Sequence, residues 1–270
     1  WGSESAGRPL LKWLYVPWGV YDTRNGATRP CCGDFDGDGR DEIAVGLGAS
    51  GGGWVAIFDD AVADFAFERW VGLGWTAYAA ANGETRPAAA DLDGDGRAEL
   101  LIGTGRYPAS GGWVQVRDDA LASFALMRWL RVDWQAYNAF DGGTWPASGD
   151  LDGDGRAEVV LGLDAYPGAG GWWRVFDDAA AGCAPVRWGH VDWLFYSSAN
   201  GETRPCAGNL DDDALHEVVV GLGPYRPAGG WFVVYDDLAR GQALLGWRRV
   251  DNPTYNALNG ETWPAASGNR

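Results

Sequence analysis

Three short acidic segments carry carboxylates at a fixed spacing that suits a hard metal ion. Each reads Asp-x-Asp-Gly-Asp-Gly-Arg-x-Glu, with side-chain oxygens at positions 1, 3, 5 and 9. Calcium takes about six to eight oxygen ligands in a flexible geometry, and the glycines at positions 4 and 6 permit positive φ, so the chain can wrap around an ion. The carbonyl of position 7 and both oxygens of the final glutamate would complete the shell. We therefore predict calcium sites.

The predicted ligands form three complete sets and one altered set. The complete sets are Asp34, Asp36, Asp38, Arg40 and Glu42; Asp91, Asp93, Asp95, Arg97 and Glu99; and Asp150, Asp152, Asp154, Arg156 and Glu158, where each arginine contributes its carbonyl. The altered set is Asn209, Asp211, Asp213, Leu215 and Glu217. Here Asp212 and Ala214 replace the two glycines. Alanine at positive φ is strained, so we expect a weaker fourth site.

Other interpretations of these segments fit the spacing less well. A solvated acidic turn explains the composition but not the repeated spacing, and magnesium, which demands octahedral geometry and holds its waters, suits a carboxylate-rich loop less than calcium does. No histidine is placed to activate a metal-bound water, so we predict a structural ion. The chain shows no set of nucleophile, histidine and carboxylate, and the Asp-Asp pair that recurs in each period is typical of a turn. We therefore do not expect an enzyme.

A second repeated block combines aromatic and polar side chains. Its clearest copy contains Trp75, Tyr78, Asn82, Glu84 and Arg86, and the aromatic pair recurs as Trp134 with Tyr137 and Trp193 with Tyr196. The block would suit a glycan, because rings stack on sugar faces while polar groups bind hydroxyls. It would equally suit packing between repeats, with arginine stacked on tryptophan and Asn-Gly in a turn. Regular repetition favours packing, and exposure of the rings would separate the two interpretations.

The elements that position these residues repeat about every 59 residues. The acidic segments begin at residues 34, 91, 150 and 209, and Trp54, Trp113, Trp172 and Trp231 recur 59 residues apart. Each period reads as four short strands separated by glycine-rich turns, for example 86–92, 98–104, 113–118 and 124–132. No sustained helical periodicity is present. Four-stranded repeats of this length predict an all-β fold, a β-propeller of four-stranded blades.

The repeats define one β-propeller domain over 1–270. Full repeats span about 28–85, 86–144, 145–203 and 204–262, with partial units at 1–27 and 263–270. The fourth-strand pattern occurs a fifth time at 11–16, and the first-strand pattern a fifth time at 263–268. Either the chain is an excerpt of a longer propeller or partner chains complete it by self-association. We favour the excerpt, because natural proteins avoid unpaired blade edges.

Composition excludes several classes of function. Lysine and arginine number 21 against 37 aspartates and glutamates, a net charge of −16 that argues against nucleic-acid and anionic-membrane binding. A hydrophobic content of 46% excludes a disordered chain. No apolar run approaches the roughly 18 residues of a membrane span, so membrane insertion is not expected.

The loop motif, repeated about every 60 residues between two strands, resembles the FG-GAP/VCBS repeats of integrin-α-type β-propellers. Related calcium-loop repeats also build propeller lectins. The resemblance implies a secreted or cell-surface propeller with calcium in its blade loops. Residues 46–48 and 221–223 read Gly-Leu-Gly instead of the Gly-Ala-Pro of integrins, so integrin-like partner binding is not carried over. We expect a non-catalytic extracellular module that binds carbohydrate; the alternative is a structural or adhesive protein that contacts cell-surface proteins.

Overall fold

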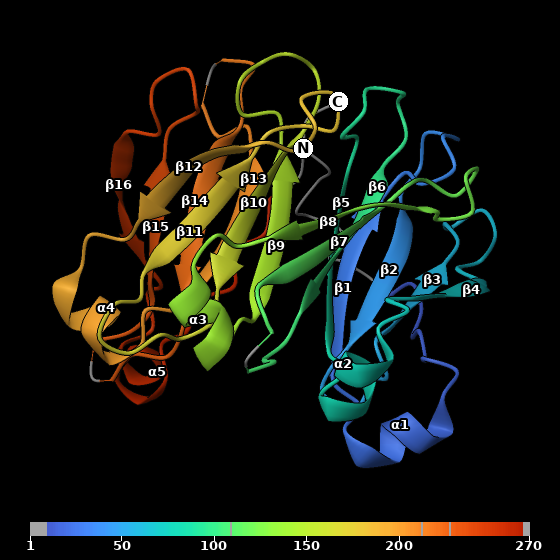
Figure 1. The fold of residues 1–270 in the computed structure, drawn as a ribbon, viewed down its shortest axis with the longest axis horizontal. Coiled ribbons are helices and arrows are strands. Elements are labelled where there is room, and N and C mark those ends of the chain that lie inside the picture. The colour runs from blue at the N-terminus through green and yellow to red at the C-terminus, as the bar shows by residue number, and fades with distance from the viewer. Residues whose placement is uncertain (1–9, 109, 212, 227, 267–270) are drawn as a thin grey trace.

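Four antiparallel sheets, each of four strands, make up the computed structural model, which describes residues 10–108, 110–211, 213–226 and 228–266 (Figure 1). In every sheet the strands pair in the order in which they follow one another along the chain. Each period therefore folds into one meander, with its first strand at one edge and its fourth strand at the other. The prediction of an all-β class with four strands per repeat is confirmed.

The four sheets have closely similar bounds. The first contains β1 (Thr28–Gly33), β2 (Glu42–Leu47), β3 (Trp54–Phe58) and β4 (Phe67–Gly72). The second contains β5 (Thr85–Ala90), β6 (Glu99–Thr104), β7 (Trp113–Arg117) and β8 (Leu126–Arg131). The third contains β9 (Thr144–Gly149), β10 (Glu158–Leu163), β11 (Trp172–Phe176) and β12 (Pro185–His190). The fourth contains β13 (Thr203–Gly208), β14 (Glu217–Leu222), β15 (Trp231–Tyr235) and β16 (Leu244–Arg249).

The predicted strands of the second repeat lie within two residues of β5 to β8. β5 ends at Ala90 because the acidic loop begins at the next residue. β8 begins at Leu126 because Ser123 and Phe124 just before it adopt φ values of 58° and 53°, which a strand does not allow.

The described residues contain five short helices that the sequence does not predict; three connect successive sheets, one precedes the first sheet and one follows the last. They are α1 (Gly19–Arg24), α2 (Thr76–Ala81), α3 (Gln135–Phe140), α4 (Leu194–Ala199) and α5 (Pro253–Leu258). Each has six residues, too few to show a helical period in the sequence. None of the helices in the described residues is long and apolar enough to span a bilayer.

The sheets stand side by side in an open series. β1 lies next to β5, β5 next to β9, and β9 next to β13. The apolar core fills the space between neighbouring sheets; for example, Leu101 and Val116 of the second sheet share one buried cluster with Val159 and Leu161 of the third. The described part of the chain therefore has propeller-like blades that do not close into a ring.

The partial units at the two ends form no strands in the described residues. Residues 11–16, predicted as a fourth strand, and 263–266 of the predicted first strand carry none, while 267 and 268 lie outside the described residues. A strand needs a hydrogen-bonded partner, and the chain supplies no other strands for these partial blades. Thr262 nevertheless docks as the first-strand threonines of the blades do: its hydroxyl donates to the Trp231 carbonyl at 2.8 Å, as Thr85 does to Trp54 at 2.7 Å.

Candidate metal centres

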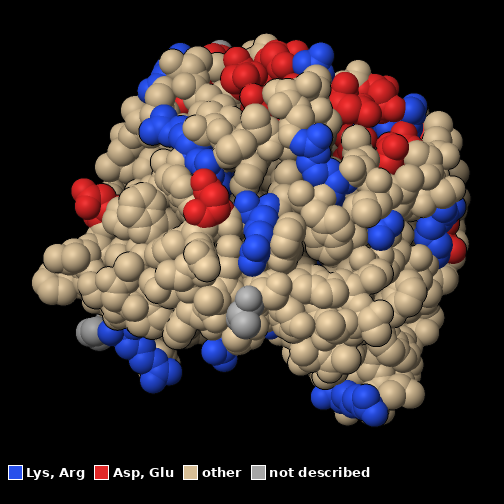
Figure 2. Space-filling view, in the orientation of Figure 1, with Lys and Arg blue, Asp and Glu red and all other residues tan. Residues whose placement is uncertain are grey.

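The acidic loops join the first strand of each sheet to the second. Figure 2 shows acidic side chains gathered at the upper end of the molecule, away from the short helices along the lower side of Figure 1. The two glycines of the first loop, Gly37 and Gly39, adopt φ values of 82° and 91°. The equivalent glycines of the next two loops have φ between 85° and 88°. The expectation that glycine supplies positive φ here is confirmed.

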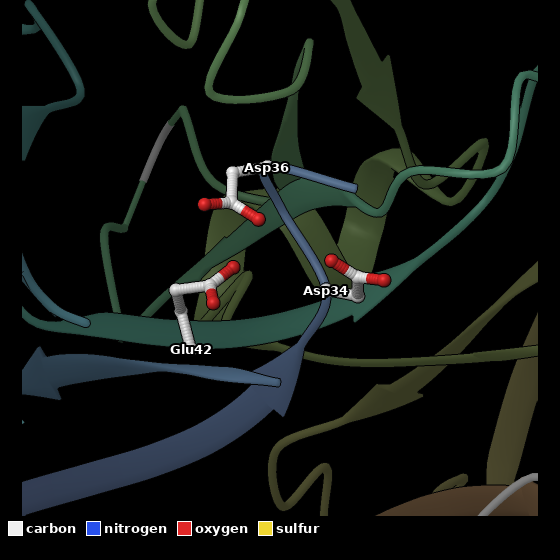
Figure 3. Close-up of side chains that lie close together, drawn as sticks. All are labelled: Asp34, Asp36 and Glu42. Carbon is white, nitrogen blue, oxygen red and sulfur yellow. The ribbon is translucent and has the colours of Figure 1, made fainter. Parts of the chain in front are cut away.

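Three carboxylates converge in the first loop. Figure 3 shows Asp34, Asp36 and Glu42 turned toward a common space, and one oxygen of each lies within 4.8 Å of the others. Both Asp34 oxygens accept loop N–H groups, from Gly37 at 2.9 Å and Gly39 at 3.0 Å. These bonds fix the loop around the carboxylate.

The second and third loops repeat the same convergence. The groups are Asp91, Asp93 and Glu99, and Asp150, Asp152 and Glu158. Positions 1, 3 and 9 of the motif therefore come together as predicted in three copies.

The glutamate at position 9 has one buried oxygen without a partner in each of these loops. Glu42 is 3% exposed, and its Oε2 accepts the Phe35 N–H at 2.7 Å. Its Oε1 is also buried but has no hydrogen bond within the described structure. Glu99 and Glu158, both fully buried, show the same pattern. A buried carboxylate oxygen without a donor is unfavourable, and a cation among the three carboxylates would satisfy it.

The pKa values of these glutamates are raised for a related reason. Burial, reinforced by the neighbouring aspartates, raises the pKa of Glu42 to about 7 and the pKa of Glu99 and Glu158 to about 8. Burial and the negative charge of the neighbouring carboxylates both disfavour the ionised glutamate. A bound cation would stabilise the ionised form. The donor set consists of hard oxygens, which fits calcium.

Position 5 differs from its predicted role. Asp38, Asp95 and Asp154 lie outside the converging groups and bind the arginine two residues later. That arginine also reaches the second aspartate of the Asp-Asp turn, as Arg40 Nε does to Asp60 at 3.5 Å. Its side chain therefore holds the loop against the turn, a role that the sequence analysis did not assign. The repeated Asp-Asp pair, which the sequence alone indicates only as a turn, is the sequence signal for this contact with the arginine.

Each loop also hydrogen-bonds to the sheet that follows it. The N–H groups of Ala98, Ala157 and His216 donate to the carbonyls of Asp34, Asp91 and Asp150, each at 2.8 Å. The residue before one sheet's second strand is thereby tied to position 1 of the preceding loop.

Part of the chain matches the model of a known protein family. Residues 34–102, from the first acidic loop into β6, match the model of the FG-GAP-like repeat. The chain carries an FG-GAP-like repeat. The match includes the second acidic loop, the loops that begin at residues 150 and 209 repeat the pattern beyond the matched stretch, and the predicted resemblance is confirmed. No curated protein matches the sequence.

Several solved structures share similarity with the chain at low identity. The exotype rhamnogalacturonan lyase YesX has 14% identity and a TM-score of 0.49, with 71% of this chain and 38% of that chain covered. The Dos1 propeller has 10% identity and a TM-score of 0.49, with coverage of 80% and 47%. The Bacillus licheniformis rhamnogalacturonan lyase PL11 has 13% identity and a TM-score of 0.49, with coverage of 83% and 51%. The chain thus spans about half or less of the length of these proteins.

The fourth acidic loop departs from the other three. Its converging oxygens come from Asp211 and Glu217 with Asp236, and from Asp213 and Glu217 with Asp237, so the Asp-Asp turn takes part. The side-chain amide of Asn209 donates to the Asp213 carbonyl. Leu215 donates its N–H to Asp213 Oδ1 at 2.9 Å. Ala214 is not among the described residues with positive φ, so the expected strain there is wrong: the loop follows a different path.

The aromatic block of the FG-GAP-like repeats lies between blades. The Trp75 ring stacks on Tyr78 with centroids 5.2 Å apart, and Tyr107 and Trp129 pack against its edges. Tyr78 is fully buried; its hydroxyl donates to the Glu84 carbonyl at 2.5 Å and accepts the Gly105 N–H at 2.7 Å. The pairs Trp134 with Tyr137 and Trp193 with Tyr196 repeat this stacking, and both tyrosines are buried.

The polar members of the block are also engaged. Asn82 donates to the Arg106 carbonyl at 2.9 Å, and Glu84 pairs with Arg86 at 2.7 Å. Glu84 and Arg86 are 8% and 7% exposed. The buried tyrosines, Glu84 and Arg86 fit the packing interpretation of this block, while Trp75, Trp134 and Trp193 remain partly exposed.

Proposed function

We propose that the chain is a calcium-stabilised, non-catalytic binding module that works outside the cell. The observation that carries the calcium part is the buried position-9 glutamate of the first three loops, which has an unpartnered Oε1 and converges with two aspartates each time. Asp34 and Asp36 follow β1 while Glu42 begins β2, so an ion held by them would pin the two strands together. Loops of this kind in extracellular modules bind calcium at about 10⁻⁴–10⁻³ M, which suits such a location.

The calcium proposal is tested by metal content and titration. The purified chain, stripped with chelator and dialysed against calcium, is expected to retain calcium by elemental analysis, and magnesium at equal concentration should not displace it. The variant E99Q keeps the size of the side chain but removes the charge of one buried ligand, so it should bind one ion fewer. A stripped chain that takes up no calcium would refute the proposal.

An open aromatic pocket on the first blade supports carbohydrate as the ligand. Pro17, Trp18, Trp54 and Trp70 line it. Trp54 is 41% exposed, whereas its equivalents Trp113, Trp172 and Trp231 are only partly exposed. Large amphipathic rings on a half-wet surface suit the apolar faces and hydroxyl rims of sugars.

The first repeat differs from the second in the segment beside this pocket, with six residues between Leu47 and Trp54 against eight between Thr104 and Trp113. In the other repeats Tyr107, Tyr166 and Tyr225 pack edge-on against the block tryptophan, with centroids 4.9–5.0 Å apart. The N–H of Tyr107 donates to the Asp141 carbonyl, and the equivalent N–H in the first repeat belongs to Ser50, which donates to the Asn82 carbonyl. Serine stands where the others have tyrosine, so the Trp18 ring lacks that cover.

The ligand proposal is tested on a glycan panel with the calcium-loaded chain. Trp54→Ala should lose stacking worth about 1–2 kcal/mol, roughly a tenfold loss of affinity or more, with little change in melting temperature. Trp113→Ala, at the equivalent position of a covered cluster, is the matched control and should keep glycan binding. A panel without any bound glycan would remove carbohydrate as the ligand.

A second candidate is adhesion to a protein through the short helices. Their exposed apolar side chains are Val20, Phe140, Leu194, Phe195 and Leu258. Leu194 and Phe195 are 74% and 72% exposed, and contiguous apolar surface of this kind marks interaction sites. A double change of Leu194 and Phe195 to serine should abolish cell-surface binding under this candidate and leave glycan binding intact.

A further inference from the structure

The fourth loop contains an arginine that comes from the Asp-Asp turn instead of the loop. Arg240 Nη2 lies 2.8 Å from Asp213 Oδ2, and its Nη1 lies 3.3 Å from Asp211 Oδ2. The same Nη1 is 3.5 Å from Asp236 Oδ1. One guanidinium therefore bridges positions 3 and 5 of the loop and the turn.

The other three blades place the positive charge differently. Their loops carry Arg40, Arg97 and Arg156 at position 7, where the fourth loop has Leu215. Their turns carry Ala63, Ala122 and Ala181 where the fourth turn has Arg240, since each of these N–H groups donates to the second aspartate of its pair. In the fourth blade the arginine stands in the turn and a leucine in the loop, whereas in the other blades the arginine stands in the loop and an alanine in the turn. Each blade keeps one guanidinium.

The exchange changes which carboxylate the guanidinium engages. In the first three blades the position-7 arginine pairs with position 5 and the turn, and position 3 remains in the converging group. In the fourth blade Arg240 takes the position-3 carboxylate of Asp211 as well. Position 1 is the neutral Asn209, so the predicted ligand positions carry one carboxylate fewer, while Asp212 adds one outside those positions.

We propose that the guanidinium of Arg240 takes the place of calcium in the fourth blade, so that the native chain binds three ions. The inference rests on the proposed calcium function. Glu217 keeps a buried Oε1 without a hydrogen bond in the described structure, as the other position-9 glutamates do. The fourth loop therefore keeps the carboxylates of a calcium site, and Arg240 pairs with two of them in place of the ion.

The test counts bound calcium by native mass spectrometry and calorimetric titration of the full chain. The wild type should bind three ions. Asn209→Asp alone should still bind three, because Arg240 remains, whereas N209D/R240A should bind four. The reciprocal variant R40L/A63R moves the guanidinium of the first blade to its turn while leaving every predicted ligand side chain in place, and it should bind two.

The outcomes separate this inference from the proposed function. Four ions of similar affinity in the wild type would overturn the inference and leave the calcium function standing. Three ions in both N209D/R240A and R40L/A63R would also overturn it. No bound ion in the wild type would refute the calcium function and this inference with it.

Discussion

The guanidinium carbon of Arg86 lies 3.6 Å from the centre of the Trp145 ring, across the boundary between the second and third blades. Arg204 of the fourth blade and Trp263 repeat the contact at 3.6 Å, two junctions further along. The Trp145 indole N–H donates to Asp164 Oδ1 at 2.6 Å, and Arg86 Nη1 binds the same oxygen at 2.7 Å. The innermost strands are thus joined by a stacked ion pair.

Loss of the arginine at this junction should be severe. Glu84 and Asp164 are poorly exposed, and Arg86→Ala removes the cation that their carboxylates share. We therefore expect a loss of about 3–5 kcal/mol in the free energy of unfolding. Urea unfolding monitored by tryptophan fluorescence measures it. Lys12→Ala removes an exposed pair with Asp64 and should change stability by less than about 1 kcal/mol. Equal effects of the two changes would contradict the importance of burial here.

The tyrosine hydroxyl between blades should matter for stability alone. Tyr78→Phe leaves the buried Gly105 N–H without its acceptor, which should cost about 1–3 kcal/mol. Thermal unfolding and glycan binding, both measured on this variant, decide whether the Tyr78 hydroxyl serves stability or binding. A variant with full stability but lost binding would return the block to the glycan interpretation.

Removal of calcium should lower the melting temperature. An ion that binds only the folded chain stabilises it by about 2.7 kcal/mol per site at a concentration 100 times its dissociation constant. Differential scanning calorimetry of the stripped chain, with and without added calcium, measures the effect. An unchanged melting temperature after confirmed stripping would argue against a structural ion.

The pH dependence of stability should contain a contribution from Asp141. Burial, together with the neighbouring charge of Asp164, raises the pKa of Asp141 to about 6. Because the folded pKa lies above the usual value of about 3.9, the stabilisation is fully present below pH 4 and is lost as the pH rises through 6. Asn82, Asn200 and Asn259 occupy the equivalent position in the other repeats.

Asp141→Asn should therefore remove this slope. The change keeps an acceptor for the Gly143 N–H and should stabilise the chain at pH 7 by on the order of 1–2 kcal/mol. Unfolding curves at pH 4, 5, 6 and 7 for both chains give the slopes. Parallel curves across this range would show that Asp141 ionises normally in the folded state.

Local signals in the sequence predicted much of this fold and site. Repeated short runs between glycine-rich turns were enough to place β5 to β8, and the spacing of Asp34, Asp36 and Glu42 was enough to predict their convergence. These features depend on residues close together in the chain. The same locality explains the positive φ of Gly37 and Gly39.

The missed features depend on contacts between repeats. The burial of Tyr78 comes from packing against Tyr107 of the following blade, and the pairing of Arg86 with Asp164 spans 78 residues. Asp38 turns to Arg40 because the arginine has a second partner in the Asp-Asp turn, which no pattern within the loop indicates. Repetition predicted that such contacts recur, but not which side chains they cover.

The main-chain bonds between successive loops have a consequence for synthesis of the chain. Ala98, Ala157 and His216 each donate to a loop that precedes them in the sequence, and each sheet pairs only strands that follow one another. Every new blade therefore finds its docking partner already made when it leaves the ribosome. Folding can advance from the N-terminal blade toward the C-terminal one.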